Sequence, residues 1–122
     1  KWVFPPRLPK GQLLYGFFQA YSRLAHGLVL VESPWLVLRL SQLDIPAVAL
    51  LGCHLYTAQH ALLVRPHRLV VMMDGDAAGR RATSRIAQQC PRATIIDLPE
   101  GCDPDDQTDA DMARLILPHL PS

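Results

Sequence analysis

Two carboxylates lie one residue apart in the segment Asp74-Gly75-Asp76, directly after the apolar run 69–73 and directly before a helix-like segment that begins at Ala77. Parallel sheets bind ligands beyond the carboxyl ends of their strands. Carboxylate oxygens placed there suit a divalent cation that carries phosphate. The spacing therefore predicts a phosphate-handling site of the magnesium type, and the alternative is that the two acids only cap the following helix.

Other acids also follow predicted strands. Glu32 comes directly after the run 28–31, and the loop after the last predicted strand carries Asp103, Asp105 and Asp106. A parallel sheet brings such strand ends to one edge, where like charges disfavour one another's ionisation unless a cation neutralises them. The pattern predicts one cation site that is assembled from distant parts of the chain.

The elements that must position these acids follow from hydrophobic patterning. Short unalternating apolar runs predict buried strands at residues 28–31, 47–51, 68–73 and 93–96. Three- and four-residue apolar spacing, with Ser33 as a cap and Pro34 in a first turn, predicts helices at residues 12–25, 35–43, 57–64, 77–89 and 108–117. Alternation of strands and helices predicts an α/β fold with about four parallel strands flanked by helices. Prolines 5, 6 and 9 predict an extended segment before the first helix.

Composition limits the class of protein. The 122 residues are 49% hydrophobic, which is enough for one core, and the net charge of +1 gives no general basic field. Cys53, Cys90 and Cys102 are too few and too scattered for a disulfide framework, so we expect reduced thiols without a disulfide partner in a cytoplasmic protein. No apolar run approaches the roughly 20 residues of a membrane span. Because the chain starts at Lys1 without a signal-peptide pattern, we expect a piece of a longer polypeptide.

A glutamate at one strand end and an Asp-x-Asp at another resemble the Toprim domain of bacterial primases, topoisomerases and certain nucleases. The likeness extends to the order of several short motifs and favours DnaG-type primases. The segments that carry it are Lys10-Gly11-Gln12-Leu13-Leu14-Tyr15-Gly16, Val29-Leu30-Val31-Glu32, the run 45–52 that ends in Leu-Gly, Asp74-Gly75-Asp76-Ala77-Ala78-Gly79 and Leu98-Pro99-Glu100-Gly101-Cys102-Asp103-Pro104-Asp105. The resemblance implies an extended lead-in and helix over residues 1–26 and a Rossmann-like Toprim domain over residues 27–122.

One departure from the primase motif concerns the acid that normally follows its glutamate by four residues. Leu36 occupies that position here, and Ser33 and Pro34 replace the glycine and the aromatic residue of the motif. In these respects the chain is more similar to the primase-like Toprim domains of phages and mobile elements. A missing ligand would weaken one cation site or shift the coordination onto Asp103 and Asp105.

The resemblance implies metal-dependent nucleotidyl transfer for RNA primer synthesis on single-stranded DNA, with Mg²⁺ or Mn²⁺ as cofactor. It implies nucleotides and a DNA template as partners, and a helicase as a further candidate partner of the full-length protein. Asp74 and Asp76 would be the principal metal ligands and would act in catalysis together with Glu32, a ligand or general base. Asp103 and Asp105 would ligate directly or through water. The basic residues that would contact nucleotide or template phosphate are Lys1, Lys10 and Arg80.

Two alternative functions remain open. One is a Toprim nuclease that cleaves DNA or RNA phosphodiesters, and the other is a non-catalytic scaffold in a replication complex. Leu36 keeps the scaffold alternative open because it removes a family acid. A phosphatase or a response-regulator receiver is disfavoured, since the acid pair of those proteins follows the first strand and not the third.

Overall fold

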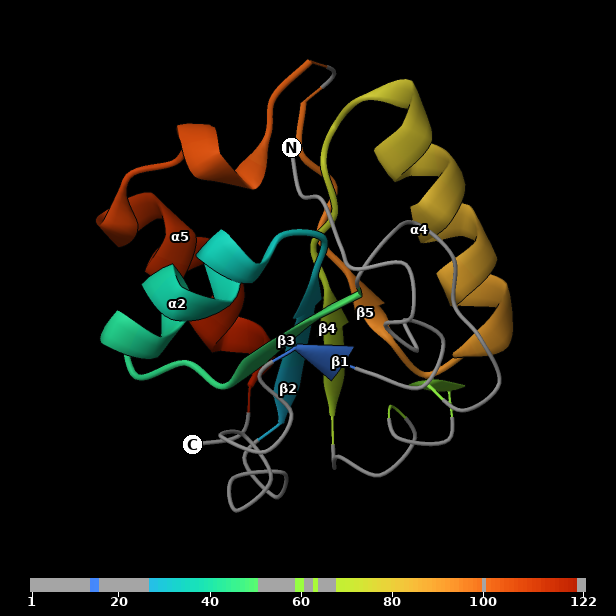
Figure 1. Cartoon of the computed structure of the whole chain (residues 1–122), viewed down its shortest axis with the longest axis horizontal. Helices are drawn as coiled ribbons and strands as arrows, with labels where there is room; N and C mark the ends of the chain where they lie inside the picture. Colours follow the sequence, from blue (N-terminus) through green and yellow to red (C-terminus); the bar gives the residue numbers. More distant parts are fainter. Residues whose placement is uncertain are drawn as a thin grey trace, which may run out of the picture.

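The structure is a computed structural model, and it describes residues 14–15, 27–50, 59–60, 63, 68–99 and 101–120. Its centre is a five-stranded sheet in the order β1-β3-β2-β4-β5 (Figure 1). The strands are β1 (Leu14–Tyr15), β2 (Leu28–Val31), β3 (Ala47–Leu50), β4 (Leu69–Val71) and β5 (Thr94–Ile95). β3, β2, β4 and β5 are parallel, whereas β1 pairs antiparallel with β3. The predicted α/β fold with four parallel strands is confirmed.

The helices flank this sheet on both faces. They are α2 (Pro34–Gln42), α4 (Ala77–Gln89), the single turn η3 (Pro104–Asp106), α5 (Asp109–Ile116) and the terminal turn η4 (Leu117–His119). In Figure 1, α2 and α5 lie on one side of the sheet and α4 lies on the other. Residues 59, 60 and 63 are also helical, in agreement with the helix predicted over residues 57–64, whose other residues lie outside the described part.

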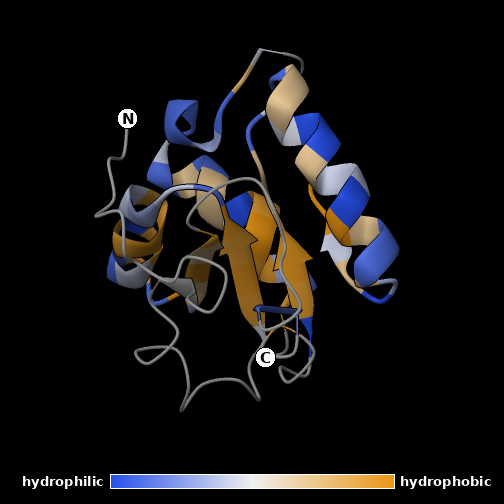
Figure 2. Cartoon of the chain, turned by 45° about the vertical axis from the view of Figure 1, so that its right-hand side comes forward, coloured by the Kyte–Doolittle hydropathy of each residue, from blue (hydrophilic) through white to orange (hydrophobic). Residues whose placement is uncertain are grey.

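Successive strand residues point to opposite faces and divide the core in two. Leu28 and Leu30 of β2 pack with Ala82 and Ile86 of α4 in one cluster. The intervening residues of the same strand pack with α2 and α5 in a second cluster; these are Val29, Val31, Leu36, Val37, Leu40, Met112 and Ile116. Figure 2 shows the resulting hydrophobic sheet between helices with polar outer surfaces. The strands thus show no alternation of apolar and polar residues because both faces of the sheet are buried.

The ends of the helices follow local sequence signals. The Ser33 hydroxyl accepts a hydrogen bond from the Trp35 amide at 3.1 Å, and Pro34 occupies the first turn of α2. Thr108 caps α5 in the same way, through a 3.1 Å bond from the Asp111 amide. Pro118 lies in η4, directly after α5, where a proline cannot continue the α-helical hydrogen bonding. The predicted cap at Ser33 is confirmed, and the structure adds the cap at Thr108, where the last helix was predicted to begin.

The helix predicted over residues 12–25 is wrong at Leu14–Tyr15, which form β1. Leu14 pairs with Leu50 and Tyr15 with Ala49 across the edge of β3. The backbone groups of an edge strand need partners, and that tertiary pairing outweighed the helical spacing of the apolar side chains. The remaining residues of the predicted helix lie outside the described part of the chain. Among the described helices, none is both long and apolar enough to cross a bilayer.

Candidate metal centre

The candidate site lies where β2 and β4 end beside each other. The chain leaves β2 through α2 to β3 on one side, and β4 then pairs with β2 on the other side. In open α/β sheets, ligands bind at such a reversal of strand order, beyond the carboxyl ends of the strands. Glu32 follows β2 directly, and Asp74 lies three residues after the end of β4. The reversal therefore brings together two acids that are 42 residues apart in the chain.

Asp76 completes the turn between β4 and α4. It is the N-cap of α4, and its Oδ1 accepts a hydrogen bond from the Gly79 amide at 2.7 Å. The predicted capping role is therefore real. A carboxylate has a second oxygen, so capping and cation binding are compatible at the same residue. The positive end of the helix dipole also favours an acid at this position.

The third part of the site is the loop that contains η3. Carboxylate oxygens of Asp74, Asp76 and Asp103 lie within 4.8 Å of one another. Asp103 is held at the start of η3, where its amide donates to Asp106 Oδ2 at 2.9 Å and its carbonyl accepts from the Asp106 amide at 3.0 Å. Three carboxylates at this spacing can surround one hard cation, for which oxygen ligands are preferred.

Two glycines allow this close approach of backbone segments. A Cβ on Gly75 would lie 2.3 Å from the carbonyl oxygen of Cys102 and 2.7 Å from that of Pro99. A Cβ on Gly79 would lie 2.0 Å from the carbonyl oxygen of Asp74. Such distances are far inside van der Waals contact, so both positions require glycine for space. The Gly75 amide also donates to Cys102 O at 2.9 Å, which fastens the residue before Asp103 to the acidic turn.

Without a cation, burial and mutual repulsion disfavour ionisation of the carboxyl groups of the site. Burial, the nearby Asp74 charge and a hydrogen bond with the Asp74 carboxyl raise the pKa of Glu32 to about 7. Burial also raises the pKa of Asp74, and burial together with the charges of Asp106 and Asp76 raises that of Asp103. Glu32 Oε1 is buried and has no hydrogen-bond partner among the described residues. A buried oxygen of this kind beside three converging carboxylates fits a divalent cation.

The structure places the other predicted site residues in different ways. Asp105 is exposed and adds no atom to the close group of Asp74, Asp76 and Asp103, and neither does Glu32. The guanidinium of Arg80 donates to the carbonyls of Gly75 and Leu98, each at 3.3 Å. Arg80 thus ties α4 to both acid-bearing loops, and its predicted contact with phosphate stays a prediction. The two predicted basic residues that lie outside the described part are Lys1 and Lys10.

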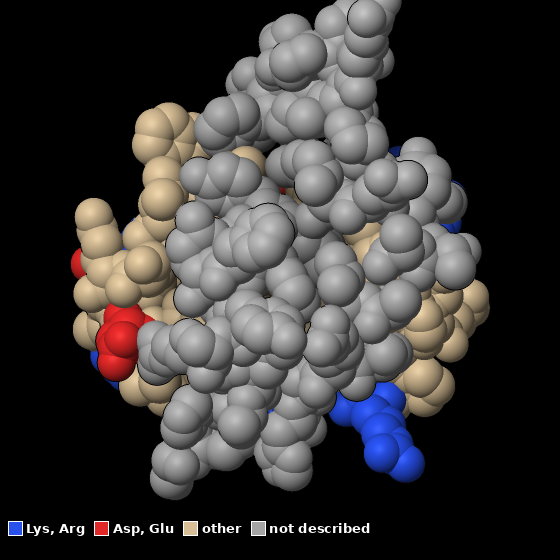
Figure 3. Space-filling model, turned by 60° about the horizontal axis from the view of Figure 1, so that its bottom comes forward, with Lys and Arg blue, Asp and Glu red and all other residues tan. Residues whose placement is uncertain are grey.

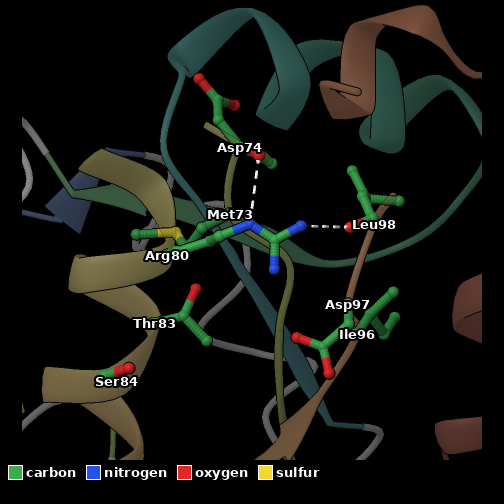
Figure 4. A pocket seen from close by; sticks show the side chains of 9 residues that line it. Met73, Asp74, Arg80, Thr83, Ser84, Ile96, Asp97 and Leu98 are labelled. Atoms are coloured by element: carbon green, nitrogen blue, oxygen red, sulfur yellow. Dashed lines mark hydrogen bonds between the residues drawn. The ribbon is translucent and has the colours of Figure 1, made fainter. Parts of the chain in front are cut away.

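Figure 4 shows Arg80 beside a small cavity of about 140 Å³. The guanidinium lies next to the Leu98 carbonyl, and the carboxylate of Asp74 points away from it. Thr83, Ser84 and Asp97 line the same cavity. Arg80 therefore contacts the two acid-bearing loops through the backbone carbonyls of Gly75 and Leu98.

Basic and acidic side chains are both present on the part of the surface that the structure describes. On the face shown in Figure 3, the Lys and Arg side chains that are visible among the described residues form separate patches, and one of these lies beside Asp or Glu side chains. The described thiols of Cys90 and Cys102 are free, and burial raises the pKa of Cys90. The acidic turn is therefore the feature of the described surface with the clearest chemistry.

Sequence patterns did not reveal the role of Arg39. Its side chain reaches Asp109 and the backbone carbonyls of Asp105 and Gln107, 66 to 70 residues further along the chain. No local motif signals a contact over that separation. The position of Leu36 also became clear only in the structure, where its side chain is buried in the core that α2 and α5 share.

Comparison with known proteins gives one consistent family. The family model described as Toprim-like matches residues 29–108. A DNA primase of Halalkalibacterium halodurans is 36% identical over 118 residues, which cover 87% of this chain and 20% of the primase. The chain thus spans about a fifth of the length of the curated relatives it matches.

Solved structures agree with this result. A DNA primase domain from Pseudomonas aeruginosa superposes with a TM-score of 0.75 at 30% identity, covering 97% of this chain and 41% of that one. A DnaG primase catalytic domain bound to single-stranded DNA gives a TM-score of 0.72 at 29% identity, covering 93% and 42% of the two chains. The match extends over both the sheet and the acid-bearing loops.

Proposed function

The chain belongs to the Toprim-like family and matches the Toprim domain of DnaG-type primases, and we propose that it is the metal-binding catalytic module of a DNA primase. The whole protein would join ribonucleotides into RNA primers on a single-stranded DNA template. The observation that carries the proposal is the convergence of Asp74, Asp76 and Asp103 beside the partnerless buried oxygen of Glu32. The single-stranded DNA bound to a similar catalytic domain supports the choice of template.

The described residues divide the work as follows. A bound Mg²⁺ or Mn²⁺ supplies positive charge that offsets the negative charge of nucleotide phosphates. Asp74, Asp76 and Asp103 would hold it. Glu32 has a pKa near neutrality, which suits a group that ligates when ionised or accepts a proton from an attacking hydroxyl. Asp105 would act through water from the exposed side of the loop.

The first experiment measures Mn²⁺ binding to the chain by calorimetry, because Mn²⁺ prefers the same oxygen ligands as Mg²⁺. We expect the wild type to bind and the double variant Asp74→Asn, Asp76→Asn to lose binding. Asp97→Asn is the control, since it makes the same kind of substitution and removes one negative charge at an exposed position just after the neighbouring strand β5. Wild-type protein that fails to bind Mn²⁺, or equal losses in the control and the double variant, would overturn the assignment of the site.

The second experiment separates primer synthesis from the nuclease alternative. Labelled DNA and RNA are incubated with the chain and Mn²⁺, and we expect neither to be cleaved. We also expect the chain alone not to make primers robustly, because its net charge of +1 gives no general basic field for a DNA template. Manganese-dependent cleavage that disappears in the Asp74→Asn variant would favour a Toprim nuclease over a primase.

A non-catalytic scaffold is the second candidate, and Leu36 is the observation that favours it. The side chain is 1% exposed and packs in an apolar cluster, so it supplies no oxygen to the site. Ser33, Pro34 and Leu36 together support placing the primase among the phage- and mobile-element-type proteins. If the wild type binds Mn²⁺ but a longer protein that contains this domain makes no primers on single-stranded DNA, the scaffold is the better description.

A further inference from the structure

Arg39 joins α2 to the loop that carries the third acid. It lies in the last turn of α2, and its side chain is 25% exposed. Its Nε donates to Asp109 Oδ1 at 2.8 Å, Nη1 donates to the Asp105 carbonyl at 3.4 Å, and Nη2 donates to the Gln107 carbonyl. A planar guanidinium presents several donors in a fixed fork, so one side chain can hold three acceptors of a folded loop.

These three acceptors span the whole segment between η3 and α5. Hydrogen bonds inside the segment run from the Asp106 amide to Asp103 O and from the Gln107 amide to Pro104 O, at 3.0 and 3.1 Å. The turn that starts at Asp103 therefore moves as a unit with the atoms that Arg39 holds. At its other end, the loop is fastened to the acidic turn through the Gly75 amide and Cys102 O.

We infer that Arg39 is a positioning residue for the cation site: by fastening residues 105–109 to α2, it holds Asp103 opposite Asp74 and Asp76. The inference rests on the proposed function, because it needs the three acids to bind a cation. Arg39 does not touch the carboxylates of this group in any contact that the structure gives. It acts on the position of the Asp103 loop through Asp105, Gln107 and Asp109.

Substitution of Arg39 has two opposite effects on cation affinity, one through the lost charge and one through the position of the Asp103 loop. This opposition makes the inference testable. Removal of a positive charge near an anionic site favours cation binding by Coulomb attraction. Loss of the loop anchor weakens cation binding, because outer contacts that orient metal ligands are typically worth about 10- to 100-fold in affinity. We therefore expect Arg39→Met to bind Mn²⁺ about 10-fold more weakly than the wild type, although the variant is less positively charged.

Two further variants separate the effect of the loop position on Mn²⁺ affinity from the effect of charge. Arg39→Lys keeps the charge, but its donors lie on a single nitrogen and not in a planar fork that matches the three acceptors. We therefore expect it also to bind Mn²⁺ more weakly. Arg114→Met is the matched control, because it removes an exposed arginine that pairs with Asp111 at 3.2 Å on α5. We expect its Mn²⁺ affinity to stay within about twofold of the wild type, the range of a weak surface charge effect.

The measurements are Mn²⁺ titration calorimetry and amide hydrogen exchange of the metal-free protein. The expected result is faster exchange at Asp106 and Gln107 in both Arg39 variants, with weaker Mn²⁺ binding and no such change in the control. If the wild type binds Mn²⁺ and Arg39→Met binds equally or more tightly, the positioning role is overturned and the metal site stands. If the wild type does not bind Mn²⁺, the proposed function fails, and this inference fails with it. If Arg39→Met does not fold, the Mn²⁺ affinity and the hydrogen exchange of Arg39→Lys test the positioning role by the same criteria.

Discussion

Substitution of Gly75 by alanine should disrupt both stability and metal affinity, for a reason of space alone. The new Cβ would lie 2.3 Å from Cys102 O and 2.7 Å from Pro99 O, and both are backbone atoms that cannot rotate away. The loop must retreat by roughly 1 Å to restore ordinary contact. That movement breaks or lengthens the bonds from the Gly75 amide to Cys102 O and from the Gly101 amide to Gly75 O, now 2.9 and 3.2 Å.

The magnitude follows from these contacts. Two lost backbone hydrogen bonds cost about 1 kcal/mol each, and overpacking costs typically 1–3 kcal/mol. We expect Gly75→Ala to lower the free energy of unfolding by about 3 kcal/mol, which corresponds to a fall in Tm of about 10 °C. Because Cys102 directly precedes Asp103, Mn²⁺ affinity should fall by about 10- to 100-fold.

Gly101→Ala is the matched control in the same loop. Gly101 has φ +80°, but a Cβ there would meet nothing within 4 Å. Alanine at this position has a conformational cost of about 1 kcal/mol and leaves the contacts of the loop in place. We expect its Mn²⁺ affinity to remain within about twofold of the wild type, because outer contacts that orient the ligands are kept.

The assays are urea unfolding and Mn²⁺ calorimetry on the wild type and the two variants. The order of stability should be wild type, then Gly101→Ala, then Gly75→Ala. If Gly75→Ala is no less stable than Gly101→Ala, or binds Mn²⁺ as tightly, then the loop is not packed against the acidic turn as argued and the reasoning is refuted.

Three other predictions concern the start of α2 and the acid before it. The folded-state pKa of Glu32, about 7, is above its ordinary value of 4.5, so its contribution to metal-free stability is present below pH 4.5 and is lost as the pH rises to about 7. The free energy of unfolding in urea should therefore be lower at pH 8 than at pH 5, and this decrease should be smaller in Glu32→Gln than in the wild type. An equal decrease in both proteins would contradict the prediction. Leu36→Asp should unfold more easily than Leu36→Ala by thermal denaturation without metal, because it buries an unpaired charge, for which about 3–5 kcal/mol is typical. Ser33→Ala should cost about 1 kcal/mol in urea unfolding through loss of the α2 cap, whereas Ser41→Ala, on the exposed side of α2, should cost much less.

Local signals in the sequence were sufficient for the strands and for most helix ends. Short apolar runs identified β2 to β5 because each strand is buried on both faces, and such burial leaves a direct trace in composition. Ser33 and Asp76 were predicted as caps because a cap is a contact between neighbours in the chain. The pairing of Leu14–Tyr15 with β3 was not readable, since strand pairing at an edge depends on a partner 34 to 36 residues away.

The sequence by itself determined that acids follow three of the four predicted buried strands, which was enough to predict a cation site, and its motifs resemble those of the Toprim domain. Only the tertiary structure decided how they meet. Strand order places β2 beside β4, which brings Glu32 to Asp74. The packing of Gly75 against residues 99–102 and the reach of Arg39 then hold Asp103 in place. These contacts join segments that are distant in the chain, and no local pattern records them because they arise from the packing of finished elements against one another.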